Sequence, residues 1–263
     1  VMAEMCAKTI QKAIKSHEGD VLAFLPGQGE IHKTADSLRG KVGGARIHLL
    51  YGALPQNKQR AAISPDKNGQ RKIVLATSIA ETSLTIEGVN IVVDSGFGRH
   101  SQFDPNSGLS RLETHRISRD SADQRAGRAG RLSPGVAYRL WSKVTHGRLT
   151  DHIIPEIEQA DLASLVLEMA NWGISDIQQM TWLTPPPKGH LMQARDLLHQ
   201  LEALENGKIT VHGKAMAQLP CHPRIAHMLI MAEEQDQVAL AADIAALLEE
   251  RDPLGREAGS DIN

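Results

Sequence analysis

The sequence predicts an α/β fold: an open parallel sheet surrounded by helices, followed by a mostly helical part. Over the first 150 residues, short apolar runs alternate with helical patterns, which is typical of right-handed βαβ units. After residue 150 this strand pattern stops, and the net charge changes from +6 over residues 99–148 to −11 over residues 151–263. We therefore place a domain boundary near residue 150.

Length and composition limit the classes of protein to consider. With 263 residues, 41% hydrophobic and 3% aromatic, the chain is long enough for about two domains with aliphatic cores. Cys6 and Cys221 stand far apart without metal-ligand spacing, which indicates reduced thiols in a cytoplasmic protein and no metal site. The sequence contains no run of 18 apolar residues, which argues against a membrane span. Because the chain starts at Val1 inside a helical pattern, we expect a fragment of a longer protein.

The elements of the first part follow from apolar patterning and turn chemistry. Helices are predicted over residues 2–17, 30–38 and 55–63. Residues 21–25 are a continuous apolar run, the mark of a strand buried on both faces of a parallel sheet. Further strands are predicted at residues 46–50, 72–76, 89–93 and 135–141. The Gly-Gln-Gly at residues 27–29 lacks the third glycine of a dinucleotide fingerprint, so a plain strand-to-helix turn is the simpler interpretation.

Ligands of open parallel sheets bind beyond the carboxyl ends of the strands. Thr77 and Ser78 follow the third strand, and Asp94 to Gly96 follow the fourth, so we expect them at this edge with residues 124–131 at or near it. Between them, residues 98–118 have alternating segments around a turn at 104–108. This segment is either a β-hairpin or an irregular surface loop.

The part after residue 150 has a different pattern. Helices at 161–172 and 188–204, with prolines at 185–187 between them, precede a tight turn and short strand at 206–213. This order is typical of a winged helix, which we place at 151–215. Helices at 223–234 and 237–250 then begin another helical unit over residues 216–263.

An arginine-rich octet, Gln124 to Arg131, carries the chemistry. Arg125, Arg128 and Arg131 recur at spacing three, so in a helix they would form one cationic strip. A guanidinium fits a phosphate bidentately and keeps its charge, as stabilising a γ-phosphoryl group requires. The alternative is the solvated basic start of an ordinary helix.

Two stretches together resemble known motifs. Residues 76–86 and 124–131 are similar to motifs V and VI of the DEAH/RHA branch of superfamily 2 helicases. The segments 24–27 and 51–55 look like the motifs around IV and IVa of that family. Further segments look like the bacterial HrpB helicases in particular: 162–167, 184–187 and 250–254.

The resemblance implies an ATP-dependent RNA helicase, in which ATP and Mg²⁺ lie between two lobes. Residues 1–150 would be the second RecA-like lobe, followed by the winged helix and the start of the ratchet domain, a helical bundle. Gln124, Arg128 and Arg131 would match positions touching the γ-phosphate and its attacking water. The other implied contacts are Glu87 and Arg125 for the nucleotide, and Gly52, Thr77, Ser78 and Thr82 for the nucleic-acid backbone.

The resemblance also implies partners outside this sequence. The phosphate-loop and Asp-Glu-Ala-His motifs are missing, so we expect the first lobe to hold ATP and Mg²⁺ and this chain alone to be inactive. Single-stranded RNA, or DNA, would be the track, and the hairpin near 99–118 would help to part strands. The alternative function is a non-catalytic module in which the winged helix binds nucleic acid or protein.

Overall fold

The computed structural model describes residues 1–82, 85–104, 109–130, 134–233 and 235–249. The chain divides into two compact units, Val1–Ile154 and Pro155–Asn263. Within the described ranges, every helix is too short or too polar to span a bilayer. The predicted boundary between the winged helix and the bundle, at residues 215 and 216, stays a prediction.

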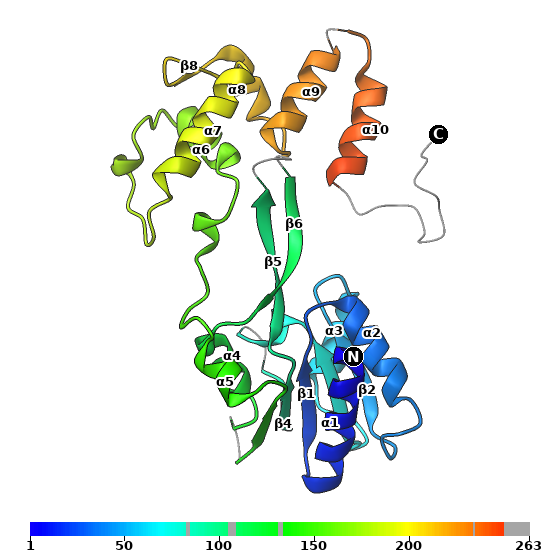
Figure 1. Ribbon diagram of the computed structural model, residues 1–263. Coiled ribbons are helices and arrows are strands. Elements are labelled where there is room, and N and C mark those ends of the chain that lie inside the picture. Colours follow the sequence, from blue (N-terminus) through cyan, green and yellow to red (C-terminus); the bar gives the residue numbers. More distant parts are fainter. Residues whose placement is uncertain (83–84, 105–108, 131–133, 234, 250–263) are drawn as a thin grey trace. The chain divides into compact units, whose positions relative to one another are not determined.

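The first unit is built on a five-stranded, fully parallel sheet in the order β2-β3-β1-β4-β7 (Figure 1). The strands are β1 (Asp20–Phe24), β2 (Arg46–Leu50), β3 (Lys72–Ala76), β4 (Val89–Asp94) and β7 (Val136–Arg139). The predicted parallel sheet is confirmed. Its central strands are mostly apolar because both of their faces are covered: along β1, Val21 and Ala23 enter one core and Leu22 and Phe24 the other.

Helices cover both faces of this sheet. They are α1 (Met2–Ser16), α2 (Gln28–Leu38), α3 (Gln56–Ile63), the 3₁₀ turn η1 (Ser78–Ala80), α4 (Arg119–Gly127) and α5 (Lys143–Gly147). The buried faces of α1 and α2 share one core with alternate residues of β1, β3 and β4. Ala62 of α3 and Ala80 of η1 pack in the core on the other face, together with Ala129 just after α4.

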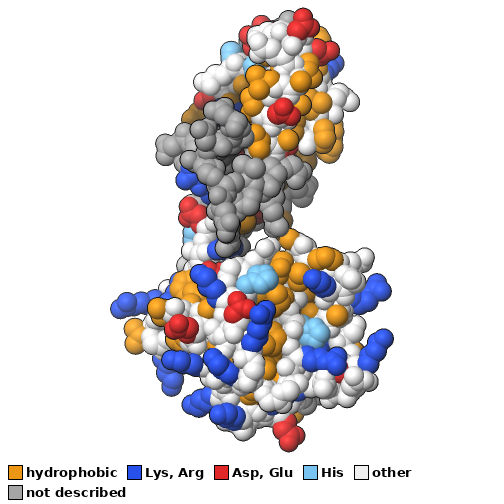
Figure 2. All heavy atoms as spheres, turned by 90° about the vertical axis from the view of Figure 1, so that its right-hand side faces the viewer, with side chains coloured by type: hydrophobic (Ala, Val, Ile, Leu, Met, Phe, Trp, Pro, Cys, Tyr) orange, Lys and Arg blue, Asp and Glu red, His pale blue; other side chains and the backbone are white. Residues whose placement is uncertain are grey.

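The face of the first unit in Figure 2 carries scattered Lys and Arg side chains and few acidic ones. Exposed lysines of α1 and α2 include Lys8, Lys12, Lys15 and Lys33. This distribution agrees with the net charge of +3 over residues 1–98. Such a surface attracts polyanions over a distance set by salt.

The segment between the sheet and α4 is a hairpin. β5 (Phe97–Asp104) pairs antiparallel with β6 (Leu109–Arg116) in unbroken register from Phe97–Arg116 to Asp104–Leu109. The hairpin prediction is therefore confirmed over the irregular loop. Its turn, residues 105–108, lies outside the described residues.

Over its described residues, the second unit is mostly helical and contains a short antiparallel strand pair. Its helices are η2 (Glu156–Glu158), α6 (Ala163–Asn171), η3 (Ile177–Gln179), α7 (Lys188–Gln200), α8 (Val211–Met216), α9 (Pro223–Glu233) and α10 (Val238–Glu249). The strands β8 (Leu204–Glu205) and β9 (Lys208–Ile209) are joined by Asn206 and Gly207, with φ of 49° and 75°. Asn-Gly with both φ positive is the favoured two-residue hairpin turn. This order agrees with the predicted winged helix, which stays an assignment from sequence.

Two boundaries in this unit differ from the predictions by more than two residues. Helix α7 ends at Gln200 rather than at 204, because Glu202 takes a left-handed conformation (φ 55°) that an α-helix does not continue through. Residues 211–213 begin α8 and are not strand. Thr210 explains this start, since its hydroxyl accepts a hydrogen bond from the amide of Gly213 (2.9 Å) as an N-cap.

An acidic residue ties two helices of this unit together. Asp161 Oδ2 lies 2.8 Å from His222 Nε2, and Asp161 Oδ1 accepts from the amide of Ala163 (2.8 Å). Burial alone raises the pKa of the Asp161 carboxyl, but its hydrogen bonds with His222 and the Ala163 amide hold that pKa below its usual range.

Replacing Asp161 by asparagine is therefore expected to lower the free energy of unfolding of the second unit by about 1–3 kcal/mol near neutral pH. A depressed carboxyl pKa contributes stability above its unfolded value that is lost as pH falls through the folded value. The gap between wild type and variant should close as the solution is acidified below about pH 4. Native-state hydrogen exchange at the α6 amides measures this difference in the free energy of unfolding. A difference independent of pH would contradict the stabilising role of the ionised Asp161 carboxylate.

Candidate functional site

The carboxyl ends of the parallel strands bring together one group of predicted residues. Gly52 follows β2, and Thr77 and Ser78 follow β3; the amide of Thr77 donates to Leu50 O (3.1 Å) and so joins these two loops. Gly52 and Ser78 are exposed, whereas Thr77 is half-buried. The strand-end rule therefore placed Thr77 and Ser78 correctly, and Gly52 lies at the end of the neighbouring strand. They form a polar rim that can donate hydrogen bonds to a ligand.

The arginine octet departs from its predicted course. Helix α4 starts near the same edge, where the amide of Ile117 donates to Gly96 O (3.2 Å), but it then runs along β4. The residues after α4 pack near the amino end of β4, where Gly135 touches both segments. A Cβ added to Gly135 would lie 2.0 Å from Ala129 O and 2.6 Å from Asn90 O of β4. Ala129 is thus away from the edge that holds Thr77.

The expected cationic strip is also wrong. Helix α4 ends at Gly127 and Arg128 is its C-cap, so of the octet's arginines only Arg125 lies within the described helix. Arg125 points into the protein and is only 2% exposed. We therefore correct the expectation that Arg125 contacts a nucleotide, because its guanidinium is already bound inside the lobe. Arg131 lies outside the described residues.

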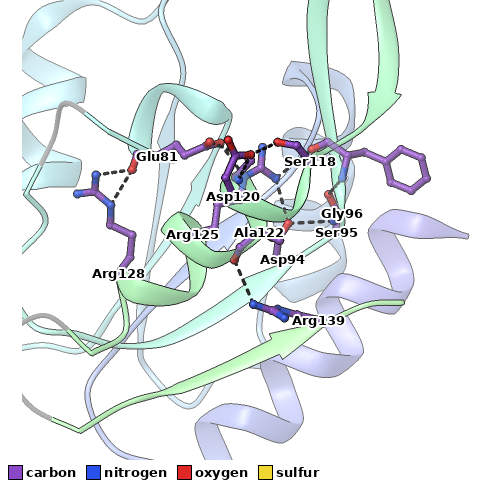
Figure 3. Close-up of polar contacts among 12 residues, drawn as sticks. Glu81, Asp94, Ser95, Gly96, Ser118, Asp120, Ala122, Arg125, Arg128 and Arg139 are labelled. Carbon is purple, nitrogen blue, oxygen red and sulfur yellow. Dashed lines mark hydrogen bonds and ion pairs between the residues drawn. The ribbon is translucent and has the colours of Figure 1, made fainter. Parts of the chain in front are cut away.

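Arg125 forms the centre of a buried polar network (Figure 3). Its Nε donates to Glu81 Oε2 (2.9 Å), and its Nη1 donates to Asp94 Oδ1 (3.0 Å) and Phe97 O (3.1 Å). The hydroxyl of Ser121 donates to Glu81 Oε1 (2.6 Å). Burial raises the pKa of the Asp94 carboxyl, although the neighbouring Arg125 opposes this change. The network fixes α4 against β4 and against the segment after β3.

Arg128 has a different environment. Its guanidinium is half-buried and reaches the main chain of the segment after η1. Nε donates to Glu81 O (2.9 Å), Nη2 donates to Thr82 O (2.7 Å), and Nη2 also contacts Glu81 O. Figure 3 shows Arg128 extended toward the Glu81 carbonyl and away from Arg125. Carbonyl oxygens carry only partial charges, so an anion is a stronger partner for this side chain.

Of the remaining predicted residues, Thr82 lies beside Arg128 through its carbonyl. Gln124 and Thr82 are exposed, and Glu87 is exposed two residues before β4 begins. The candidates thus separate into the strand-end group of Gly52, Thr77 and Ser78, and a second group along α4 and the segment between β3 and β4. That segment connects the two groups.

Sequence reasoning missed Glu81 and Ser121, and it gave Asp94 only a place at the edge. A signal was present, since Asp94 ends an apolar strand and Glu81 follows the apolar pair Ile79-Ala80. Buried acids of this kind require a cation. At the other side of α4, Arg139 of β7 donates to Asp123 Oδ1 (2.6 Å) and to Ala122 O (3.5 Å), which anchors the helix further.

Comparisons with known proteins agree with this geometry. Residues 4–133 match the family model of the helicase conserved C-terminal domain. The ATP-dependent RNA helicase HrpB of Escherichia coli (strain K12) is 47% identical over 243 residues, which are 92% of this chain and 30% of that protein. A crystal structure of the E. coli DExH-box NTPase HrpB superposes with a TM-score of 0.86 at 46% identity, over 96% of this chain and 31% of that chain.

A second crystal structure, of the Escherichia coli DEAH/RHA helicase HrpB, gives a TM-score of 0.88 at 46% identity, over 95% of this chain and 32% of that chain. The chain therefore spans about 30% of the length of the curated relative that it matches.

Proposed function

We propose that this chain, which belongs to the DEAH/RHA helicases, supplies one half of a shared ATP site. The premise is that it carries their helicase conserved C-terminal domain. Its first unit has the RecA-like fold of such lobes. The protein would be an ATP-dependent RNA helicase, with Gln124, Arg128 and Arg131 facing a nucleotide held by a first lobe. The observation that carries this proposal is the half-buried guanidinium of Arg128, whose Nε and Nη2 donate to main-chain carbonyls that phosphate oxygens can replace (Figure 3).

The donor chemistry of these residues suits the γ-phosphoryl group. An arginine can exchange two carbonyl acceptors for phosphate oxygens without changing its own charge, and it gains most as negative charge builds on them. Gln124 can orient a water by accepting and donating hydrogen bonds. Mg²⁺, which neutralises phosphate charge when bound, would be held by the first lobe. Glu87 is an acceptor for a ribose hydroxyl.

The strand-end group suits a nucleic-acid backbone. Gly52, Thr77, Ser78 and Thr82 offer hydroxyl and main-chain groups, which bind phosphates and sugars and do not read bases. Binding to single-stranded RNA, or DNA, should therefore be nearly independent of sequence, and it should weaken with salt wherever Lys and Arg side chains neutralise phosphates. We assign residues 151–215 to a winged helix and 216–263 to the start of the ratchet domain. The hairpin of β5 and β6 would help to part strands.

The cellular setting belongs to the same proposal. Cys6 is buried and Cys221 half-buried, and neither forms a disulfide. Burial raises the pKa of the Cys6 thiol to about 12, so it is inert at neutral pH. We place the protein in the cytoplasm.

This chain by itself is expected not to hydrolyse ATP. The phosphate-loop lysine and hydroxyl and the magnesium-binding carboxylates are missing from its sequence, and they supply most of the electrostatic support for the transition state. The test measures phosphate release from Mg²⁺-ATP by the chain alone and by a polypeptide carrying both lobes, each with and without single-stranded RNA. Only the two-lobed protein should be active. Turnover by the chain alone that Arg128→Ala abolishes would contradict the shared site.

A further inference from the structure

Glu81 contacts both described arginines of the octet, and it does so with different groups. Its carboxylate accepts from Arg125 Nε (2.9 Å) and from the Ser121 hydroxyl (2.6 Å), while its main-chain carbonyl accepts from Arg128 Nε (2.9 Å). Figure 3 shows these contacts on opposite sides of the same residue. Thr82, the next residue, gives its carbonyl to Arg128 as well (2.7 Å).

The carboxylate of Glu81 is not needed to neutralise Arg125. Asp94, 2% exposed, already pairs with Arg125 through Nη1, and Asp94 Oδ1 also accepts from the amide of Gly96 (2.9 Å). The ring of Phe24 lies under the guanidinium, 4.9 Å from its carbon. Glu81 is a second buried acid, so it adds negative charge to the neutral Arg125–Asp94 pair and its burial costs desolvation free energy. Its hydrogen bonds to α4 fix the position of residues 81 and 82.

We propose that Glu81 is a positioning residue that couples the nucleic-acid side of this lobe to its nucleotide side. The coupling rests on the proposed function. The bonds from Arg125 and Ser121 fix Glu81 to helix α4, and the carbonyls of Glu81 and Thr82 then hold Arg128. A nucleic-acid backbone that moves Thr82 moves the acceptors of Arg128, and a phosphate that takes Arg128 releases the segment carrying Thr82.

This arrangement makes the effect reciprocal. Two sites linked through one set of hydrogen bonds change each other's binding free energy by the same amount. RNA that displaces Thr82 releases Arg128 for phosphate oxygens, and we expect RNA to stimulate ATP turnover in this way. The size of that stimulation should depend on how rigidly residues 81 and 82 are attached to α4, because a misplacement of about 1 Å can cost about 100-fold in rate.

The test compares Glu81→Gln with wild type in a polypeptide carrying both lobes. Glutamine keeps the length and one acceptor, and it leaves the Arg125–Asp94 pair intact, so the lobe should fold. We expect the ratio of RNA-stimulated to unstimulated ATPase to fall about 10-fold or more, and the RNA concentration for half-maximal stimulation to rise. Ser121→Ala, which removes one of the two bonds to the carboxylate, should lower the ratio less.

Arg46→Gln is the matched control. It breaks a surface ion pair with Asp66 (3.0 Å) at the start of β2 and should leave the ratio unchanged. An unchanged ratio in Glu81→Gln, or equal losses with and without RNA that follow the folded fraction, would overturn the coupling. If wild type shows no RNA stimulation at all, the proposed function fails, and the coupling with it.

A second measurement needs no turnover. Hydrogen exchange in residues 77–82 of this chain should be faster in Glu81→Gln, with β1 and β3 unchanged. Unaltered exchange there would refute the positioning role itself, whether or not the protein is a helicase.

Discussion

Replacing Arg128 by alanine is expected to lower the RNA-stimulated ATPase rate of a two-lobed polypeptide about 10³- to 10⁵-fold. This corresponds to about 4–7 kcal/mol of transition-state stabilisation. The side chain already lies at the surface of the lobe with its Nε and Nη2 on main-chain carbonyls, and charge developing on a phosphoryl group is a far stronger acceptor for it. Steady-state kinetics with saturating ATP and single-stranded RNA measures the loss.

The stability of the lobe should change little in the same variant. Arg128 is half-buried, and water can replace its hydrogen bonds to Glu81 O and Thr82 O, so we expect a change of about 1 kcal/mol in the free energy of unfolding. Arg119→Ala is a control on the same helix, since Arg119 forms an exposed ion pair with Asp151 (2.7 Å). A rate for Arg128→Ala within 10-fold of wild type would remove Arg128 from the ATP site.

Arg131 is predicted from sequence alone to behave like Arg128, and the variant Arg131→Ala tests this in the same assay. Lysine at either position keeps the charge but not the planar fork. Because bidentate contact to phosphate oxygens depends on that fork, lysine should restore only a small part of the rate.

The sheet could be predicted from the sequence because its information is local. An apolar run such as Val21 to Leu25 can be buried on both faces only in a covered parallel sheet, and parallel strands place Thr77 and Gly52 at one edge. The hairpin was one of two interpretations that the local pattern left open, and the antiparallel register of β5 and β6 decides for it.

The burial of Arg125 could not be predicted, because its partners are distant in sequence. Glu81 is 44 residues away and Asp94 is 31 residues away. Arg128 still has αR dihedrals (φ −66°, ψ −29°) and both arginines reach Glu81, so spacing three does not tell which of the two is buried. The direction of α4 along β4 is likewise a tertiary property, so the separation of the strand-end group from the Arg128 side was not visible in the sequence.

Replacing Arg125 by alanine is expected to have the largest effect on stability, lowering the free energy of unfolding of the first unit by about 3–5 kcal/mol. The variant leaves Glu81 and Asp94, 8% and 2% exposed, as neighbouring buried acids without their cation. Asp94 Oδ2 already has no hydrogen-bond partner in wild type. Native-state hydrogen exchange at the amides of β1 and β3 reports this unit separately from the second.

The pH dependence separates a lost ion pair from a simple cavity. Burial raises the pKa of Asp94 even with Arg125 present, and removing the guanidinium removes the main influence that lowers it. A carboxyl whose folded pKa lies above its unfolded value binds protons more tightly in the native state, so the native state gains stability as pH falls through the folded pKa. The deficit of Arg125→Ala should therefore shrink between pH 7.5 and 5, whereas a cavity would cost the same at both. Adding Glu81→Gln and Asp94→Asn should recover much of the loss at pH 7.5, because no unpaired charge then remains in the core.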